Sequence, residues 1–146
     1  MSRPVAVICA LAAGGLVALQ APANSSLSEH VSDLGAALVS LALSATIIAT
    51  LLLVVGHPGR LSGLSAFKPE HVIGGLAGAA IVSVSLVAVR PLGVGGLTSV
   101  LVAAQLIVSV AADRFGWFGL DEIGLTPSRW AGLALVIAGT ILVTRT

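Results

Sequence analysis

The chain has 146 residues, of which 57% are hydrophobic and only 9% are charged, and its formal net charge is +1. A soluble globular domain is roughly 45–50% apolar and about 25% charged, so this composition excludes a protein that covers its surface with polar groups. It also excludes a disordered chain and a nucleic-acid-binding protein, which needs clustered Lys and Arg. We expect an integral membrane protein whose first partner is the lipid bilayer.

Five apolar runs are long enough to cross a bilayer, which takes about 20 residues with a range of roughly 17–25. Backbone amides find no water in hydrocarbon, and barrel strands would alternate over about ten residues, so these runs predict helices. The sequence therefore predicts an all-α, polytopic bundle of five transmembrane helices forming a single membrane domain over residues 1–146. The expected spans are 5–21, 34–55, 72–89, 94–112 and 127–143.

The first span has a second interpretation. Arg3 precedes an apolar stretch that ends at Ala21-Pro22-Ala23, which is typical of a signal peptide with a small-residue cleavage site. Cleavage would leave four helices. The stretch is at the long end for a signal peptide, which favours a retained helix. If that helix continues through Pro22, Gln20 and Asn24 share one of its faces because they are four residues apart.

Turn and capping residues separate the runs. The stretch 24–33 is polar and acidic, and 56–70 is rich in Gly and Pro. Arg90-Pro91-Leu92-Gly93 predicts a tight turn because a proline cannot continue the preceding helix. Thr126 is expected to cap the last helix, with Pro127 at its first position.

Lys and Arg are distributed unevenly between the two sides of this five-span topology. The N-terminus, the second connection and the fourth connection hold five of them, and the opposite side holds two. Because cytoplasmic loops carry an excess of Lys and Arg, this bias predicts a cytoplasmic N-terminus and an external C-terminus. All five aromatic residues lie in or beside the second and fourth connections, where they are typical of anchors at the membrane surface.

The sequence contains no recognisable catalytic or metal-binding pattern. Its three histidines are far apart, Cys9 is the only cysteine, and no nucleophile elbow or HExxH spacing occurs. We expect no catalytic residue, no metal, no cofactor and no nucleic-acid partner, so an enzyme is disfavoured. No ionisable side chain lies between the helix ends, which disfavours a proton-coupled exporter with a buried carboxylate.

Amides and hydroxyls are the polar groups that remain in the spans. Gln105 lies near the middle of the fourth span, and Gln20 and Asn24 lie at the end of the first. An unpaired amide in hydrocarbon costs several kcal/mol, so these side chains either line a polar substrate path or bond between helices. For four hydroxyls a structural role is favoured, because hydroxyls also bond their own backbone: Thr46, Thr50, Ser83 and Ser85.

Glycines mark two faces on which helices can approach closely. Gly74, Gly75 and Gly78 lie on the third span, and Gly132 and Gly139 lie on the fifth. Glycine permits backbone contact, which promotes helix association in lipid. These faces would pack either within one subunit or between two.

Several of these motifs occur in a characteristic order. They are Gln20-x-Pro22-x-Asn24, Gly74-Gly75-x-x-Gly78, Arg90-Pro91-Leu92-Gly93, Gln105 with Asp113-x-Phe115-Gly116, and Thr126-Pro127-Ser128-Arg129-x-x-Gly132. The ordered set resembles the small YdcZ-type family of bacterial inner-membrane proteins, within the drug/metabolite transporter superfamily. The resemblance covers roughly residues 10–143, with a departure at 40–44, where the family more often has an aromatic residue and a glycine.

The resemblance implies how such a chain works. It argues against signal cleavage, because Gln20 and Asn24 belong to the family pattern on both sides of the cut. Superfamily members with ten helices look like two five-helix halves in opposite orientation, with a binding site near the midplane. This chain would then be half of a ten-helix inverted-repeat transporter, and its partner would be a second copy or a related five-helix protein in opposite orientation.

We expect a bacterial inner-membrane protein that transports a small organic solute by alternating access, as an antiparallel homodimer or heterodimer. The expected pathway residues are Gln20, Asn24 and Gln105, with Asp113 and Arg114 at its mouth. Asp113 is the expected coupling group, unless it simply pairs with Arg114 or an interface. The alternative function is a non-transporting membrane accessory or scaffold subunit.

Overall fold

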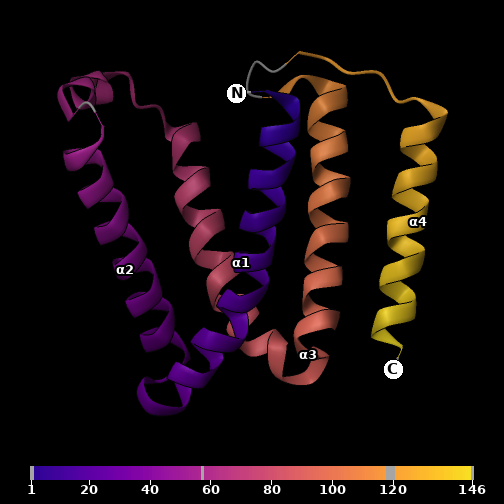
Figure 1. Ribbon diagram of the computed structural model, residues 1–146, viewed down its shortest axis with the longest axis horizontal. Helices are drawn as coiled ribbons and strands as arrows, with labels where there is room; N and C mark the ends of the chain where they lie inside the picture. The colour runs from indigo at the N-terminus through magenta and orange to yellow at the C-terminus, as the bar shows by residue number, and fades with distance from the viewer. Residues whose placement is uncertain (1, 57, 118–120, 146) are drawn as a thin grey trace. The chain divides into compact units, whose positions relative to one another are not determined.

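The computed structural model describes residues 2–56, 58–117 and 121–145, and within these ranges every regular element is a helix. Four helices are long and apolar enough to cross a membrane (Figure 1): α1 (Arg3–Val31), α2 (Asp33–Val54), α3 (Val72–Phe115) and α4 (Pro127–Thr144). Two short 3-10 helices, η1 (Pro58–Ala66) and η2 (Pro69–His71), connect α2 to α3. The predicted all-α membrane class is confirmed.

The chain divides into two compact units, Met1–Arg90 and Pro91–Thr146. The first unit holds α1, α2, the 3-10 helices and the first part of α3. The second unit holds the remainder of α3 and α4. Each unit has its own interhelical contacts.

The longest helix, α3, is 44 residues long and is interrupted at Gly93, whose φ of 66° and ψ of 171° are not helical. An uninterrupted helix of this length would measure about 66 Å, roughly twice the 30 Å hydrocarbon core. We call residues 72–92 its first arm and residues 94–115 its second arm. The described residues thus form four apolar helices where the sequence predicted five spans, and the third and fourth predicted spans lie in the two arms of α3.

The predicted turn at residues 90–93 is present, but Pro91 does not make it. Pro91 lies among helical residues, and the break in the helix is at Gly93. A glycine is favoured at this position because a positive φ with an extended ψ is strained for residues that carry a Cβ, although Ser32 adopts a similar conformation, with φ 74° and ψ 162°.

The first helix is longer than predicted. α1 continues through Pro22 to Val31, whereas the sequence predicted that the first span ends at residue 21. Most of the polar stretch 24–33 is therefore helical, because its serines and Asn24 are accommodated in the helix, and Ser28 Oγ donates to the Ser25 carbonyl at 2.7 Å. Only Ser32 separates α1 from α2, with φ 74°, and its side chain accepts a hydrogen bond from Gly35 N at 3.3 Å.

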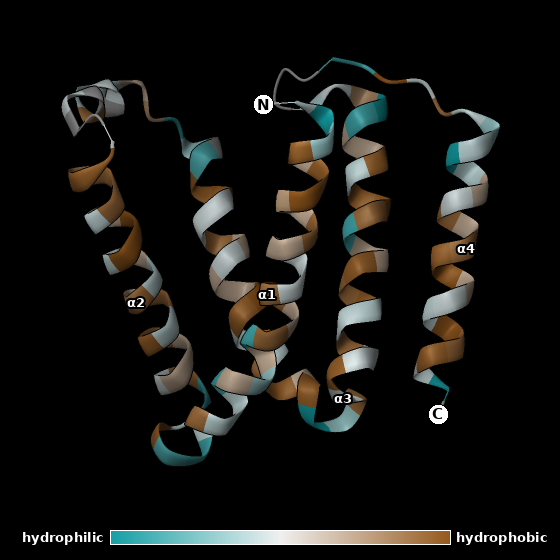
Figure 2. Ribbon diagram, in the orientation of Figure 1, coloured by the Kyte–Doolittle hydropathy of each residue, from teal (hydrophilic) through white to brown (hydrophobic). Residues whose placement is uncertain are grey.

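The core of the first unit is small. Ala36 and Ala37 of α2 are buried with Val82 and Leu86 of the first arm of α3, and Leu27 packs beside them. The remaining large apolar side chains mostly face outward, and brown colour follows the helices over most of their length (Figure 2). A bilayer protein packs helices through small residues and leaves larger apolar ones to the lipid, which explains this distribution.

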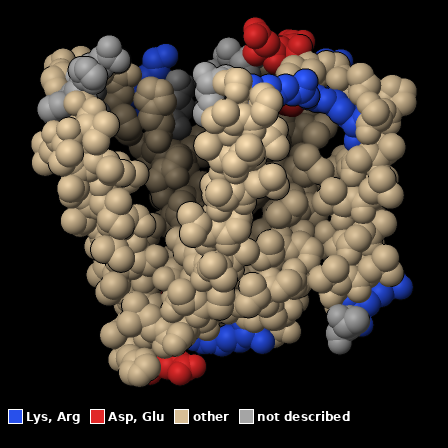
Figure 3. All heavy atoms as spheres, viewed as in Figure 1, with Lys and Arg blue, Asp and Glu red and all other residues tan. Residues whose placement is uncertain are grey.

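Charged side chains lie near helix ends. On the face shown in Figure 3, the middle parts of the helices carry neither Lys and Arg nor Asp and Glu. Ionised groups are costly at the centre of a bilayer, so this distribution places the helix ends at its two surfaces.

Candidate functional site

The two amides of α1 lie in the first unit, and the structure gives them different surroundings. Asn24 is half-buried, and its Nδ2 donates to Ser40 Oγ of α2 at 3.1 Å. Gln20, one turn earlier, is also half-buried, and its side-chain amide has no hydrogen-bond partner among the described residues.

A polar cluster that the sequence analysis did not identify joins three helices of the first unit. Arg90, at the end of the first arm of α3, bonds both carboxylate oxygens of Asp33, with Nη1 at 3.3 Å from Oδ2. Its Nη2 also donates to Ser28 Oγ at 2.9 Å. We call Ser28, Asp33 and Arg90 the clamp. The predicted topology places Asp33 and Arg90 in connections on the same side of the membrane. Their shared side and opposite charges could have indicated this pairing.

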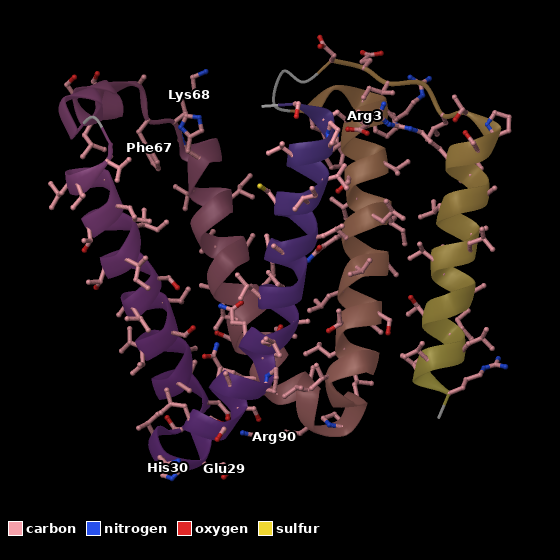
Figure 4. The ribbon with its side chains drawn as sticks, viewed as in Figure 1. Arg3, Glu29, His30, Phe67, Lys68 and Arg90 are labelled. Atoms are coloured by element: carbon pink, nitrogen blue, oxygen red, sulfur yellow. The ribbon has the colours of Figure 1, made fainter. Side chains whose placement is uncertain are left out.

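Figure 4 places Arg90 at the same end of this unit as Glu29 and His30, where α1 gives way to α2. Lys68 and the N-terminal Arg3 lie at the opposite end of the unit. The clamp therefore joins helix ends at one surface of the predicted bilayer.

A second ion pair lies in the second unit. Arg129 Nη1 of α4 is 3.2 Å from Asp113 Oδ2 of α3, and the two side chains are 33% and 32% exposed. Asp113 thus pairs with Arg129, and not with Arg114, which was one of the alternatives that the sequence left open. Consecutive helical residues point in different directions, so Arg114 instead lies 3.9 Å from Glu122, with both side chains well exposed.

Local structure fixes both partners of this pair. Thr126 caps α4 as predicted, because its Oγ1 and its carbonyl both accept from Arg129 N, at 3.4 and 3.0 Å. This places Arg129 in the first turn of the helix. Ile123 N donates to the Asp113 carbonyl at 2.8 Å, so the segment before α4 is tied to the end of α3.

A pocket of about 260 Å³ lies between the second arm of α3 and α4, with this ion pair in its lining. The rest of the lining is mostly apolar: Leu106, Ser109, Val110, Gly132 and Leu133. A Cβ at Gly132 would meet no atom within 4 Å, so the glycine leaves space at the wall. The described residues contain no group of three His, Cys, Asp or Glu that could hold a metal ion. The pocket offers charge and apolar contact for binding a solute.

The predicted pathway residues are thus only partly brought together. Asp113 lines the pocket, whereas Gln105 and Arg114 are not among its lining residues. Gln105 is exposed near the middle of the second arm and has no hydrogen-bond partner in the described ranges. Arg129, which the sequence analysis noted only within a motif, is the second charged residue of the pocket.

The glycine faces are not in close contact with another helix within the described parts of the chain. A Cβ added at any of five positions would meet no atom within 4 Å: Gly74, Gly75, Gly78, Gly132 and Gly139. Their role in helix packing therefore stays a prediction. The hydroxyls of Thr46 and Thr50 donate to backbone carbonyls of α2 at 2.8 and 2.9 Å, as their structural interpretation expects.

The sequence profile of one protein family matches residues 5–142, and this family is described as "putative inner membrane exporter, YdcZ". No curated protein and no solved structure matches the chain. The matched range includes the clamp, the pocket and the Asp113–Arg129 pair.

Proposed function

The chain belongs to the family described as "putative inner membrane exporter, YdcZ", and from that membership we propose that it is half of a transporter for a small organic solute. It works by alternating access, paired with a second copy or a related chain in opposite orientation. The two arms of α3 cross the bilayer separately, which gives five spans, a cytoplasmic N-terminus and an external C-terminus.

Two properties of α3 support five spans. The helix is too long to cross the hydrocarbon once, and its only non-helical residue, Gly93, lies between two apolar arms. Asp113 lies about 30 Å beyond Gly93 along the second arm, which matches the thickness of the hydrocarbon. Two five-span halves joined in one chain have opposite orientations, and two separate five-span chains that insert in opposite orientations reproduce that arrangement.

The observation that carries the proposal of a partner is the exposed amide of Gln105. It lies near the middle of the second arm, where lipid would surround it in an isolated chain. Lipid offers no hydrogen bond, so the amide needs a second chain or a water-filled path. Gln105 meets its own copy in an antiparallel pair, because a two-fold axis in the membrane plane inverts depth and leaves only residues near the midplane opposite their own copies. A glutamine both donates and accepts, so two copies can bond each other.

Disulfide cross-linking in native membranes tests this arrangement. In a background in which Cys9 is replaced by serine, Thr98→Cys and Ala112→Cys each place a thiol two turns, or about 10.5 Å, from Gln105 on the same face. An antiparallel pair joins the first variant to the second when two tagged copies are co-expressed. Either variant expressed alone forms no disulfide in an antiparallel pair, because its two identical thiols are then about 21 Å apart, beyond disulfide range.

Gln105→Cys is the matched control, because it forms a disulfide in either a parallel or an antiparallel pair. Self-linking of Thr98→Cys without the mixed product would overturn the antiparallel arrangement. If Gln105→Cys forms no product, a second copy does not cover this face and the partner is a different chain. C-terminal reporters active on opposite sides of the membrane complete the test. Two orientations indicate self-pairing, one orientation indicates a related partner, and an even number of crossings contradicts the half-transporter.

The alternative function is a non-transporting accessory subunit. Gln105→Leu separates the two, because it removes the amide and keeps an apolar helix surface. A transporter loses flux while still assembling, and a scaffold retains its role.

A further inference from the structure

The pocket of the second unit has one charged end and one apolar end. Asp113 and Arg129 lie where α3 finishes and α4 begins, and Leu106 lies about two helical turns away along the second arm. The charged end thus falls at the predicted membrane surface, and the apolar lining extends toward the hydrocarbon. A ligand that fits both ends has an apolar body and a charged head.

The ion pair leaves binding capacity unused. One nitrogen of Arg129, Nη1, approaches one oxygen of Asp113, Oδ2, at 3.2 Å. A guanidinium has five N–H donors and a carboxylate has about four acceptor sites, so each group can bond a ligand without breaking this contact. Arg129 also lies in the first turn of α4, where the helix dipole favours a bound anion.

We infer that this pocket binds a small zwitterion with an apolar body, its carboxylate on Arg129 and its ammonium on Asp113, an inference that rests on the proposed transport function. A ligand with a single charge would bond to only one of the two charged residues. Both side chains are about two-thirds shielded, so their interactions are screened less than those of fully exposed charges. Arg129 is suited to the carboxylate because the planar guanidinium can bond it through two parallel N–H groups.

The size of the pocket limits the ligand. Sites for drug-sized molecules have volumes of roughly 300–1,000 Å³, and this one has about 260 Å³. Leu106, Val110 and Leu133 supply apolar contact without a further ionisable group. A branched aliphatic amino acid meets these conditions, so L-leucine is the probe.

Three probes of one shape separate the contributions of the two charges. L-leucine carries both, 3-methylbutylamine lacks the carboxylate, and 4-methylpentanoate lacks the ammonium group. Binding of radiolabelled L-leucine to the purified full chain, and its displacement by the other two, is measured in detergent against empty micelles. We expect each single-charge probe to compete at least tenfold more weakly than unlabelled leucine, because a hydrogen bond to a charged group is lost.

Five variants connect these differences to the pocket. Arg129→Gln weakens leucine binding about tenfold, and leucine then binds no more tightly than 3-methylbutylamine. In Asp113→Asn, leucine binds no more tightly than 4-methylpentanoate. Arg114→Gln is the matched control, because its side chain lies beside Glu122 and does not line the pocket. Gly132→Leu fills the pocket and abolishes binding. Gly139→Leu leaves binding unchanged, because Gly139 also has open space but does not line the pocket.

Failure of this inference differs from failure of the proposed function. Absence of leucine binding at millimolar concentration, equal competition by the three probes, or binding that Gly132→Leu leaves intact each overturns the zwitterion site. A Gln105-dependent flux of another solute would still support a transporter in that case. If leucine binds with the stated dependence and reconstituted vesicles do not move it, the site stands and the transport function is wrong.

Discussion

The clamp of the first unit and the Asp113–Arg129 pair of the second use the same chemical groups differently. Arg90 applies its guanidinium to both oxygens of Asp33 and to Ser28, so three helix ends are joined by one side chain. Arg129 makes a single contact with Asp113, and the pair borders a pocket. A two-nitrogen contact with an added hydroxyl fixes geometry, whereas a one-nitrogen contact leaves donors for a ligand. The comparison assigns structure to the clamp and binding to the pocket.

The largest expected effect lies between these regions, at Gly93. Replacing it by valine forces a β-branched side chain into a positive φ with extended ψ, which costs about 1–3 kcal/mol or more. We expect Gly93→Val to lower the thermal stability of the detergent-solubilised chain and its yield in membranes. Gly95→Val is the matched control, because Gly95 has open space around its Cβ position and lacks the positive φ. Equal losses from the two variants would show that the kink does not depend on the backbone conformation of glycine.

The clamp should matter more for stability than the pocket pair. Arg90→Gln removes the contacts to Asp33 and to Ser28, and we expect it to lower stability more than Arg129→Gln does, because several hydrogen bonds between helix ends are lost. Arg129→Gln removes one contact, so about 0.5 kcal/mol or less is expected. Thermal unfolding of the two variants in detergent ranks them. Double-mutant cycles with Asp33→Asn and Asp113→Asn isolate each coupling free energy, and a larger value for Asp113 and Arg129 would reverse the assignment.

The helices could be predicted from the sequence because hydrocarbon leaves an apolar run of this length little alternative to a helix. The cap at Thr126 followed from local chemistry and was confirmed. The extension of α1 could not be read, because the polar residues after Pro22 are compatible with a helix once a neighbouring helix supports them. Asn24 illustrates this, since its amide bonds Ser40 of α2.

Ion-pair partners were the least predictable part of the site. Asp33 and Arg90 are separated by 57 positions, and only the packing of helix ends brings them together. Asp113 and Arg114 are adjacent in sequence, yet the helix directs them to different partners. Arg129 lies in a recognisable motif, but its place in a pocket depends on how α4 packs against the second arm of α3.

A smaller effect is expected at the hydrogen bond between α1 and α2. Asn24→Ala should cost about 0.6 kcal/mol, the average measured for interhelical hydrogen bonds in a membrane protein. Ser40→Ala should have a similar effect, and the double variant should cost little more than either one, because both remove the same 3.1 Å contact. Unfolding in mixed micelles measures the three values. Full additivity would contradict direct bonding and would leave Asn24 free to act as a pathway residue.

The smallest effect is expected at Arg114 and Glu122. Their charged atoms are 3.9 Å apart, and the side chains are 52% and 70% exposed, so solvent screens the attraction and side-chain entropy opposes it. Arg114→Gln should change stability by less than about 0.5 kcal/mol and should leave leucine binding unaffected. A marked loss of leucine binding in this variant would instead place Arg114 at the mouth of the path. The charged end of the pocket would then extend beyond Asp113 and Arg129. The binding site would contain three charged residues, and the comparison with the clamp would have to include Arg114.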